Sequence, residues 1–319
     1  MLLVSICTMI ACGGRFPSHL GKVVDLPSNT PLLAAAGDIA CDPNSSFFHN
    51  GRGDRTHCHM KATSDLVLSL KPTAVLALGD TQYETGSPSA YARSYGPTWG
   101  RFKAITHPVL GNHEDRTSRA SGYFNYFGDA AGTPGQGYYS FNLQSWHLIA
   151  LNSNCNRVGG CGEGSPELEW LKKDLAANHS ACILAFWHHP RFSSGLHGSN
   201  RELEPFWNAL YDAGADVVLV GHDHDYERFA PLTPAGRLDE KRGIRQFVVG
   251  TGGKNQRGFL HFVPALGYNS RFSEARFLSF GVIEMELAPN FYVWKFIAEN
   301  GKVLDSGSAA CHIGAADHK

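Results

Sequence analysis

The sequence has few charged residues and almost no net charge. Of its 319 residues, 18% are Asp, Glu, Lys or Arg, and the formal net charge is −1. Globular domains usually contain about a quarter of charged residues, and neither a basic stripe nor an acidic tail is present here. The composition therefore gives no indication of a nucleic-acid partner or of substrates attracted by net charge.

Hydrophobic runs long enough to span a membrane are also missing. The apolar stretch 2–11 is too short to cross a bilayer as a helix and resembles the hydrophobic part of a signal peptide. Residues 9–12 resemble a bacterial lipobox, although Met9 replaces the usual leucine and no Lys or Arg precedes the run. We expect residues 1–30 to be a leader and short linker, and the protein to be secreted or extracytoplasmic. Lipidation of Cys12, which would be its one membrane attachment, and plain secretion are alternatives.

The sequence has eight cysteines, and six remain once Cys7 and Cys12 in the leader are set aside. An even number in an exported chain is typical of disulfides, with ~15 possible pairings for six cysteines. We favour the pairs Cys41–Cys58, Cys155–Cys161 and Cys182–Cys311. The first two would close polar loops, and the third would tie the C-terminus to a strand.

Short apolar runs alternate with helical patterns over the first two thirds of the chain. Runs typical of buried strands lie at 32–36, 74–78, 108–110, 182–187 and 216–220. Helical patterns lie at 60–70, 88–102, 166–177 and 202–213. After Gly221 the pattern changes to strands separated by turns. This order predicts an α/β fold with two sheets in a sandwich, in a single domain over residues 31–311 with a tail at 312–319.

Five of the apolar runs end in residue types that bind metals. The endings are Gly37-Asp38, Gly79-Asp80, Gly111-Asn112-His113-Glu114, His188-His189-Pro190 and Gly221-His222-Asp223-His224. Open α/β sheets bind their ligands at the carboxyl ends of strands. We interpret the five endings together as one two-metal site in which Asp80 is shared between the ions.

The donor types differ between the two halves of this site. Three are anionic oxygens: Asp38, Asp80 and Tyr83. Three are neutral: Asn112, His188 and His222. Anionic oxygens suit a trivalent hard ion such as Fe(III), whereas the neutral donors with the shared carboxylate suit a divalent ion. His224 lies two residues after His222, so in an extended segment both imidazoles point to one side and can bind one ion each.

In this order, the motifs resemble those of calcineurin-like metallophosphoesterases and, more narrowly, of purple acid phosphatases. Those families show GDxG, GDxxY, GNH[ED], a His two before Pro, and GHxH, and the resemblance covers residues 32–297. Ala40 stands where the broader superfamily has a metal-binding His, while Tyr83 is present, an exchange typical of purple acid phosphatases. The resemblance implies a four-layer αββα fold and an exported phosphatase that hydrolyses phosphomonoesters by attack of a metal-bound hydroxide.

Carried over position by position, the resemblance also implies the ligand sets. Fe(III) would be bound by Asp38, Asp80, Tyr83 and His224. The second ion, which would be Zn, Mn or Fe(II), would be bound by Asp80, Asn112, His188 and His222. His113 matches the histidine of GNH, and His197 matches a histidine nine residues past His188. As imidazolium, both would neutralise the phosphate and protonate the leaving oxygen.

Alternatives are open at two positions and for the activity. Adjacent strand residues face opposite ways, so His188 and His189 compete for one role, and the spacing to Pro190 favours His188. His197 lies in a predicted loop, where a surface histidine is common. The rival activity is a phosphodiesterase or nucleotidase with a di-Zn or di-Mn site; like the phosphatase, it would act on a small phosphoester. A weaker rival is a secreted metal- or phosphate-binding protein without turnover.

Overall fold

The computed structural model describes residues 26–27, 29–260 and 271–312. The signal-like stretch with Cys7 and Cys12, and the tail beyond His312, lie outside the described residues. Within them, no helix combines the length and apolar character that crossing a membrane requires.

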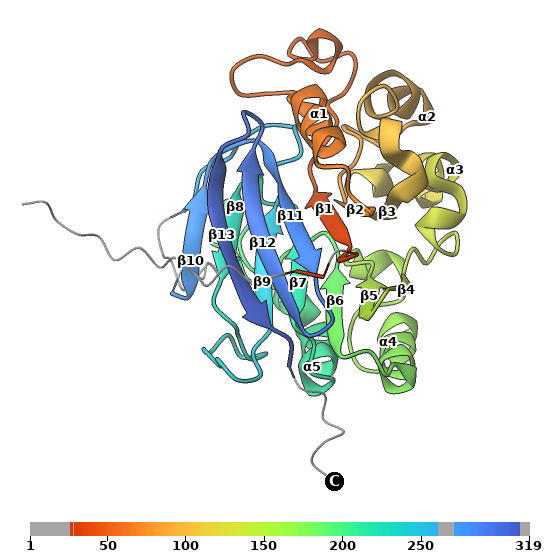
Figure 1. The fold of residues 1–319 in the computed structure, drawn as a ribbon. Coiled ribbons are helices and arrows are strands. Elements are labelled where there is room, and N and C mark those ends of the chain that lie inside the picture. Colours follow the sequence, from red (N-terminus) through yellow and green to blue (C-terminus); the bar gives the residue numbers. More distant parts are fainter. Residues whose placement is uncertain (1–25, 28, 261–270, 313–319) are drawn as a thin grey trace, which may run out of the picture.

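Two mixed β-sheets face each other in the centre of the molecule (Figure 1). The six-stranded sheet has the order β13 (Val303–Ala310), β12 (Phe291–Ala298), β11 (Gly281–Leu287), β1 (Leu32–Ala36), β2 (Ala74–Leu78) and β3 (Thr106–Val109). The seven-stranded sheet has the order β10 (Ser273–Phe277), β8 (Tyr226–Phe229), β9 (Arg245–Val249), β7 (Val217–Val220), β6 (Cys182–Phe186), β5 (Trp146–Ala150) and β4 (Tyr139–Leu143). One buried cluster contains residues of both sheets, for example Leu33, Leu148, Phe247 and Trp294. The predicted two-sheet sandwich is therefore confirmed.

The strands that lead to the predicted motifs all pair in parallel. β1, β2 and β3 are parallel, as are β5, β6, β7 and β9. The later strands β11, β12 and β13 extend the first sheet by antiparallel pairing. Because the carboxyl ends of parallel strands lie at one edge, this topology brings distant motifs to the same end of the sandwich.

Helices pack on the outer sides of the sheets. They are α1 (Met60–Leu70), α2 (Pro88–Ala90), α3 (Ser121–Phe127), α4 (Pro166–Ala177) and α5 (Glu204–Asp212). Short segments of 3-10 or π helix are η1 (His49–Gly51), η2 (Tyr91–Tyr95), η3 (Trp99–Ile105), η4 (Glu114–Arg116), η5 (Ser118–Ala120), η6 (Gly128–Ala131), η7 (Cys155–Arg157) and η8 (Arg201–Leu203). Leu168 of α4 and Trp207 of α5 share a buried cluster with Val218 of β7, whereas α1 contacts β11 of the other sheet. The layer order is thus helix, sheet, sheet, helix.

The residues that predict a helix start at Ser165 form an N-terminal helix cap in the structure. The Ser165 side chain accepts a hydrogen bond from Leu168 N at 3.4 Å, and Pro166 opens α4. A hydroxyl cap followed by proline satisfies the free amides of the first turn at little cost. The predicted helix 88–102 is wrong as one element, because it divides into α2, η2 and η3.

All three predicted disulfides are present: Cys41–Cys58, Cys155–Cys161 and Cys182–Cys311. Cys182 is the first residue of β6 and Cys311 directly follows β13, so this bond joins the two sheets covalently.

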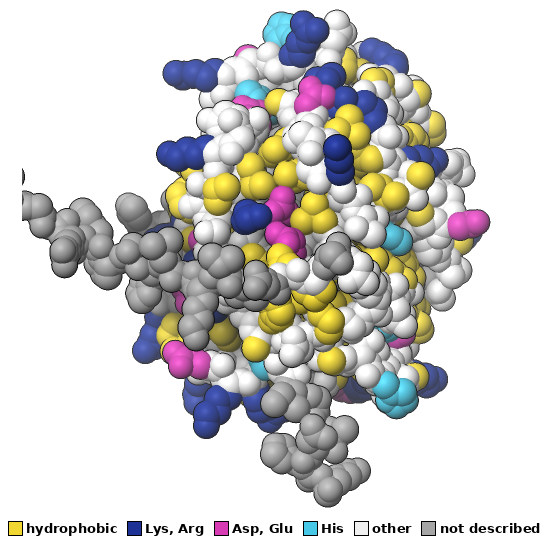
Figure 2. Space-filling model, in the orientation of Figure 1, with side chains coloured by type: hydrophobic (Ala, Val, Ile, Leu, Met, Phe, Trp, Pro, Cys, Tyr) yellow, Lys and Arg dark blue, Asp and Glu magenta, His cyan; other side chains and the backbone are white. Residues whose placement is uncertain are grey.

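The outer face of β11 and β12 is partly exposed. Figure 2 shows hydrophobic side chains on this side of the molecule around a small charged group. Lys295 Nζ on β12 lies 2.7 Å from Glu284 Oε1 and 3.4 Å from Glu286 Oε1 on β11. These charges are paired across the strands and lie on a sheet face, away from the carboxyl ends of β1 and β2.

Candidate metal centre

The predicted strand endings meet at one end of the sandwich. Asp38 N, after β1, donates to Gly79 O, after β2, at 3.1 Å. In the other sheet, Gly221 N donates to His188 O at 3.0 Å. The His188 imidazole then crosses between the sheets, because its Nδ1 lies 2.9 Å from Leu78 O. Chain segments that are far apart in sequence therefore share one site.

Three of the predicted ligands have left-handed backbone conformations. The φ angles are 59° at Asp38, 46° at Asp80 and 73° at His222. Such a φ costs a residue other than glycine about 1–2 kcal/mol, so the surrounding contacts must hold it. Strain of this kind concentrates at functional sites.

The glycines of the motifs are explained by close approach. A Cβ on Gly111 would lie 2.1 Å from Asp80 Oδ1, and a Cβ on Gly79 would lie 2.6 Å from His188 Nδ1. Any larger residue would push these predicted ligands aside. The sequence therefore places glycine where two ligand-bearing loops touch.

The first group of donors gathers around Asp38. Tyr83 Oη donates to Asp38 Oδ1 at 2.8 Å. His224 Nε2 lies 3.1 Å from Tyr83 Oη and 3.2 Å from Asp38 Oδ1. His224 Nδ1 lies 2.9 Å from the Asn255 amide oxygen, so it carries the proton and leaves the Nε2 lone pair facing the group. Burial and Asp38 raise the pKa of the Tyr83 phenol well above its usual range, so only a strongly polarising cation would make it a phenolate.

The second group gathers around His188. Its Nε2 lies 3.2 Å from Asn112 Oδ1 and 3.2 Å from His222 Nδ1. The same nitrogen lies 3.5 Å from Asp80 Oδ2. Two imidazoles and one amide oxygen thus converge beside one carboxylate.

Asp80 lies between the two groups. Ligand atoms of Asp38, Asp80 and His188 all lie within 4.8 Å of one another. Despite the opposing effect of burial, His188 holds the pKa of the Asp80 carboxyl well below its usual range, and Asp80 raises the pKa of His188 to about 10. The ion-pair partners of Asp38 and Asp80 among the described residues are histidines alone. Two buried carboxylates balanced only by imidazoles form a donor set that fits bound cations.

The two predicted non-ligand histidines flank this centre. His113 N donates to Asp80 Oδ1 at 2.8 Å, and its ring packs 4.2 Å from that of Tyr83. The His197 ring lies 4.4 Å from that of His222. Burial lowers the pKa of both His113 and His197. These surroundings favour neutral imidazoles, against the imidazolium that the resemblance implies, unless bound phosphate raises the pKa again.

His188, and not its neighbour, faces Asp80. His189 Nδ1 lies 2.8 Å from Ser153 Oγ, although its other contacts keep it in the cluster: ligand atoms of His188, His189 and His222 lie within 4.8 Å of one another. Burial lowers the pKa of His189 to about 3. It is therefore a neutral neighbour of the second group.

Sequence reasoning did not assign Asn255, Arg116 or Arg257 to the site. Asn255 orients His224, and the two guanidinium groups lie against His113 and His197. Arg116 ends η4, and Asn255 and Arg257 lie in the loop after β9; none of the three belongs to a metal-binding pattern. The only available signal was their closeness in sequence to the GNHE motif or to the glycine-rich turn 250–253.

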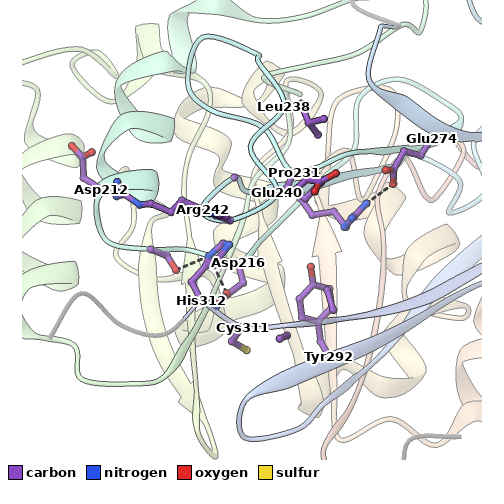
Figure 3. Close-up of a pocket in the computed structure, with 16 residues that line it drawn as sticks. Asp212, Asp216, Pro231, Leu238, Glu240, Arg242, Glu274, Tyr292, Cys311 and His312 are labelled. Carbon is purple, nitrogen blue, oxygen red and sulfur yellow. Dashed lines mark hydrogen bonds and ion pairs between the residues drawn. The ribbon is translucent and has the colours of Figure 1, made fainter. Parts of the chain in front are cut away.

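A cavity of about 840 Å³ lies at the opposite end of β7 (Figure 3). Two of its acidic side chains have partners within the lining. Asp216 Oδ1 accepts a hydrogen bond from His312 N at 2.6 Å, and Arg245 Nη1 lies 2.5 Å from Glu274 Oε2. With Asp216 before β7 and His222 after it, this cavity lies at the other edge of the sheet from the five motifs.

Comparison with known proteins agrees with the geometry. Residues 34–226 match the family model for calcineurin-like phosphoesterase. The chain is similar to purple acid phosphatase 15 of Arabidopsis thaliana, with 29% identity over 278 residues, which are 73% of this chain and 47% of that protein. It is also similar to mouse tartrate-resistant acid phosphatase type 5, with 23% identity over 318 residues, which are 87% of this chain and 90% of that protein. The chain spans about half the length of the Arabidopsis relative.

A solved structure shares the fold. The purple acid phosphatase PPD1 from yellow lupin seeds superimposes with a TM-score of 0.68 at 17% identity, covering 90% of this chain and 55% of that one. The residues matched by the family model include all five strand-end motifs, from Asp38 to His224. The chain therefore belongs to the calcineurin-like phosphoesterase family, and its relatives there include purple acid phosphatases.

Proposed function

We propose that this protein is an exported phosphatase with two metal ions that hydrolyses phosphomonoesters, in the manner of purple acid phosphatases. The observation that carries the proposal is the meeting of two chemically different donor groups at Asp80. One contains the phenol of Tyr83, 2.8 Å from Asp38 Oδ1, and the other contains the imidazole of His188, 3.5 Å from Asp80 Oδ2.

The donor sets support two different ions. The residues that would hold Fe(III) are Asp38, Asp80, Tyr83 and His224. The residues that would hold Zn, Mn or Fe(II) are Asp80, Asn112, His188 and His222. When bound, such a pair supplies an activated water nucleophile and polarises the phosphate oxygens.

The other roles belong to side chains of the protein. His113 and His197 flank the centre from two different loops, where they would bind phosphate oxygens and pass a proton to the leaving oxygen. The Glu114 carboxylate keeps the loops in place, because it accepts hydrogen bonds from Gln82 N at 3.0 Å and Gly111 N at 2.8 Å. We assign these roles to one catalytic domain over residues 31–311.

Export is supported by the disulfides. Three disulfides in one domain are typical of proteins that fold in an oxidising compartment. The leader at residues 1–30 would direct the protein there, with Cys12 as the candidate lipid attachment.

Two chromogenic substrates test the activity. Purified protein loaded with iron and zinc should hydrolyse para-nitrophenyl phosphate with a higher kcat/KM than bis-para-nitrophenyl phosphate at mildly acid pH. A preference for the diester would favour the phosphodiesterase alternative. Full metal occupancy without turnover of either ester would favour a binding protein.

A further inference from the structure

Each of the two histidines that flank the centre has a guanidinium group against its outer nitrogen. Arg116 Nη2 lies 3.4 Å from His113 Nε2, and Arg257 Nη1 lies 2.5 Å from His197 Nε2. Arginine has donors only, so each Nε2 is the acceptor in these contacts. At His113 the opposite nitrogen, Nδ1, lies 2.7 Å from Glu84 O and therefore carries the proton.

Both arginines are tied to the loops that carry predicted ligands. Arg116 Nη1 donates to Glu84 O at 3.3 Å, one residue after Tyr83. The backbone N of Arg257 donates to His224 O at 3.1 Å. The two guanidinium groups are therefore held at the rim of the centre, on the strand-end loops that follow different sheets.

Their charge is not neutralised by carboxylates. Among the described residues, no Asp or Glu oxygen lies within 4.0 Å of Arg116 or Arg257. Arg116 is exposed and Arg257 is half-buried. The buried Arg191 is paired with Glu204, and the half-buried Arg228 is paired with Asp305. At the same rim, the ammonium of Lys254 is paired with Glu84. Within the described part of the chain, the two rim arginines are thus cations without a carboxylate partner.

We propose that Arg116 and Arg257 are specificity-determining residues that bind anionic oxygens of the substrate and select phosphomonoesters over phosphodiesters. The proposal rests on the proposed function and names its substrate class. A phosphomonoester carries about −1.5 to −2 charges at pH 7, whereas a diester carries a single one. A guanidinium stays charged at every working pH, and its planar fork matches two phosphate oxygens.

Single substitutions to glutamine test this. We expect Arg116→Gln and Arg257→Gln each to lower the ratio of kcat/KM for para-nitrophenyl phosphate over bis-para-nitrophenyl phosphate by about tenfold, the loss of one charge-assisted hydrogen bond. The loss should appear mainly in KM. Calorimetry should show weaker binding of inorganic phosphate by a similar factor. Arg257→Lys should recover part of the lost phosphate affinity, because lysine keeps the positive charge but lacks the planar fork of the guanidinium.

The controls separate this proposal from a structural role and from the activity itself. Arg52 is exposed in the loop closed by Cys41–Cys58 and supplies the matched variant Arg52→Gln. This variant should leave the ester ratio and the phosphate affinity unchanged. An unchanged ester ratio in both rim variants would overturn the proposal, as would loss of bound metal measured by elemental analysis. If the wild type hydrolyses neither ester, the proposed function fails, but the phosphate affinity still tests the arginines. Equal phosphate affinity in the wild type and the variants, or no phosphate binding by the wild type, would overturn the role of the arginines.

Discussion

At the scale of single residues, the site depends on a few side chains whose environments differ sharply. Asp38 and Asp80 are buried beside imidazoles, and Tyr83 donates to Asp38 from a buried position. Burying carboxylates without a cation is costly. Bound metal should therefore stabilise these side chains in the arrangement described. Substituting one of them should lower the metal affinity more than it lowers the stability of the fold.

His113 is the residue whose role separates chemistry from metal binding. His113→Ala removes an imidazole that flanks the centre without belonging to either donor group, so kcat should fall by about 10²–10⁴-fold while both metals stay bound. Steady-state kinetics with elemental analysis measures both quantities. The exposed residue His49 gives the control, His49→Ala, which should retain full activity. Loss of metal from His113→Ala would show that the histidine is structural.

Much of the site could be predicted at this scale because its ligands lie next to strand ends. Asp38, Asp80 and His188 each follow an apolar run, and the carboxyl ends of parallel strands lie at one edge of a sheet. The spacing to Pro190 favoured His188 over His189, and the fold turns the His188 imidazole toward Asp80 and the His189 imidazole toward Ser153. The positions of Arg116 and Arg257 depend on the paths of loops, and hydrophobic periodicity does not predict such paths.

At the scale of elements, loops after β2 and β3 are joined by one carboxylate. Glu114 is fully buried and accepts hydrogen bonds from Gln82 N, Gly111 N and Thr81 Oγ1, the last at 3.1 Å. Burial raises its pKa to about 7. It links the two loops that carry Asp80 and Asn112.

Replacing this carboxylate should loosen both loops. Glu114→Gln keeps the shape but turns one acceptor into a donor that faces a backbone N–H, so the free energy of unfolding should fall by about 1–3 kcal/mol. Chemical denaturation of the variant and of Glu240→Gln, an exposed control, measures this. Equal stability of wild type and Glu114→Gln would mean that the loops are held by other contacts.

The start of β7 contributes a pH dependence. Burial raises the pKa of Asp216 from 3.8 to about 6, so the folded state binds its proton more tightly than the unfolded state. This stabilisation is fully present below about pH 4 and is lost as the pH rises to about 6. Between pH 4 and pH 6, the free energy of unfolding should fall less in Asp216→Asn than in the wild type, and the difference between the two falls should be up to about 3 kcal/mol. Urea unfolding at pH 4, 5 and 6.5 tests this, and parallel pH profiles would contradict it.

Elements were predicted best where composition and period agree. The strands 32–36 and 74–78 correspond residue by residue to β1 and β2. β13 was not predicted, because Val303–Ala310 is rich in serine, glycine and alanine and takes its strand conformation from pairing with β12. The stretch 88–102 was predicted as one helix, but its aromatic residues pack within separate turns. The Tyr91 and Tyr95 rings of η2 lie 5.7 Å apart, and the Trp99 and Phe102 rings of η3 lie 5.4 Å apart.

At the scale of the whole molecule, the sandwich is closed by a covalent link between its sheets. Cys182–Cys311 has a sequence separation of 129, whereas Cys155–Cys161 has a separation of 6. In the chain-entropy model, the disulfide that closes the longer loop stabilises the folded protein by about 5 kcal/mol, and the disulfide that closes the shorter loop by about 2 kcal/mol. The inter-sheet bond should therefore matter more to stability.

Paired serine substitutions compare the two disulfides. The double variant at 182 and 311 should lose more unfolding free energy than the double variant at 155 and 161, by about 2–3 kcal/mol, as measured by denaturation in guanidinium chloride. Because both variants lose two cysteines, each serves as the control for the other. An equal or reversed order would show that native-state contacts, and not loop closure, decide the effect.

The central claim is that Asp80 joins two metal ions of different kind, one of them bound by the phenol of Tyr83. Elemental analysis combined with the visible absorption spectrum of the purified protein, beside Tyr83→Phe, tests it most directly. We expect two metal ions per chain, one of them iron, and a tyrosine-to-iron charge-transfer band that disappears in Tyr83→Phe. A protein that is active and colourless, or that binds a single ion per chain, would contradict the claim.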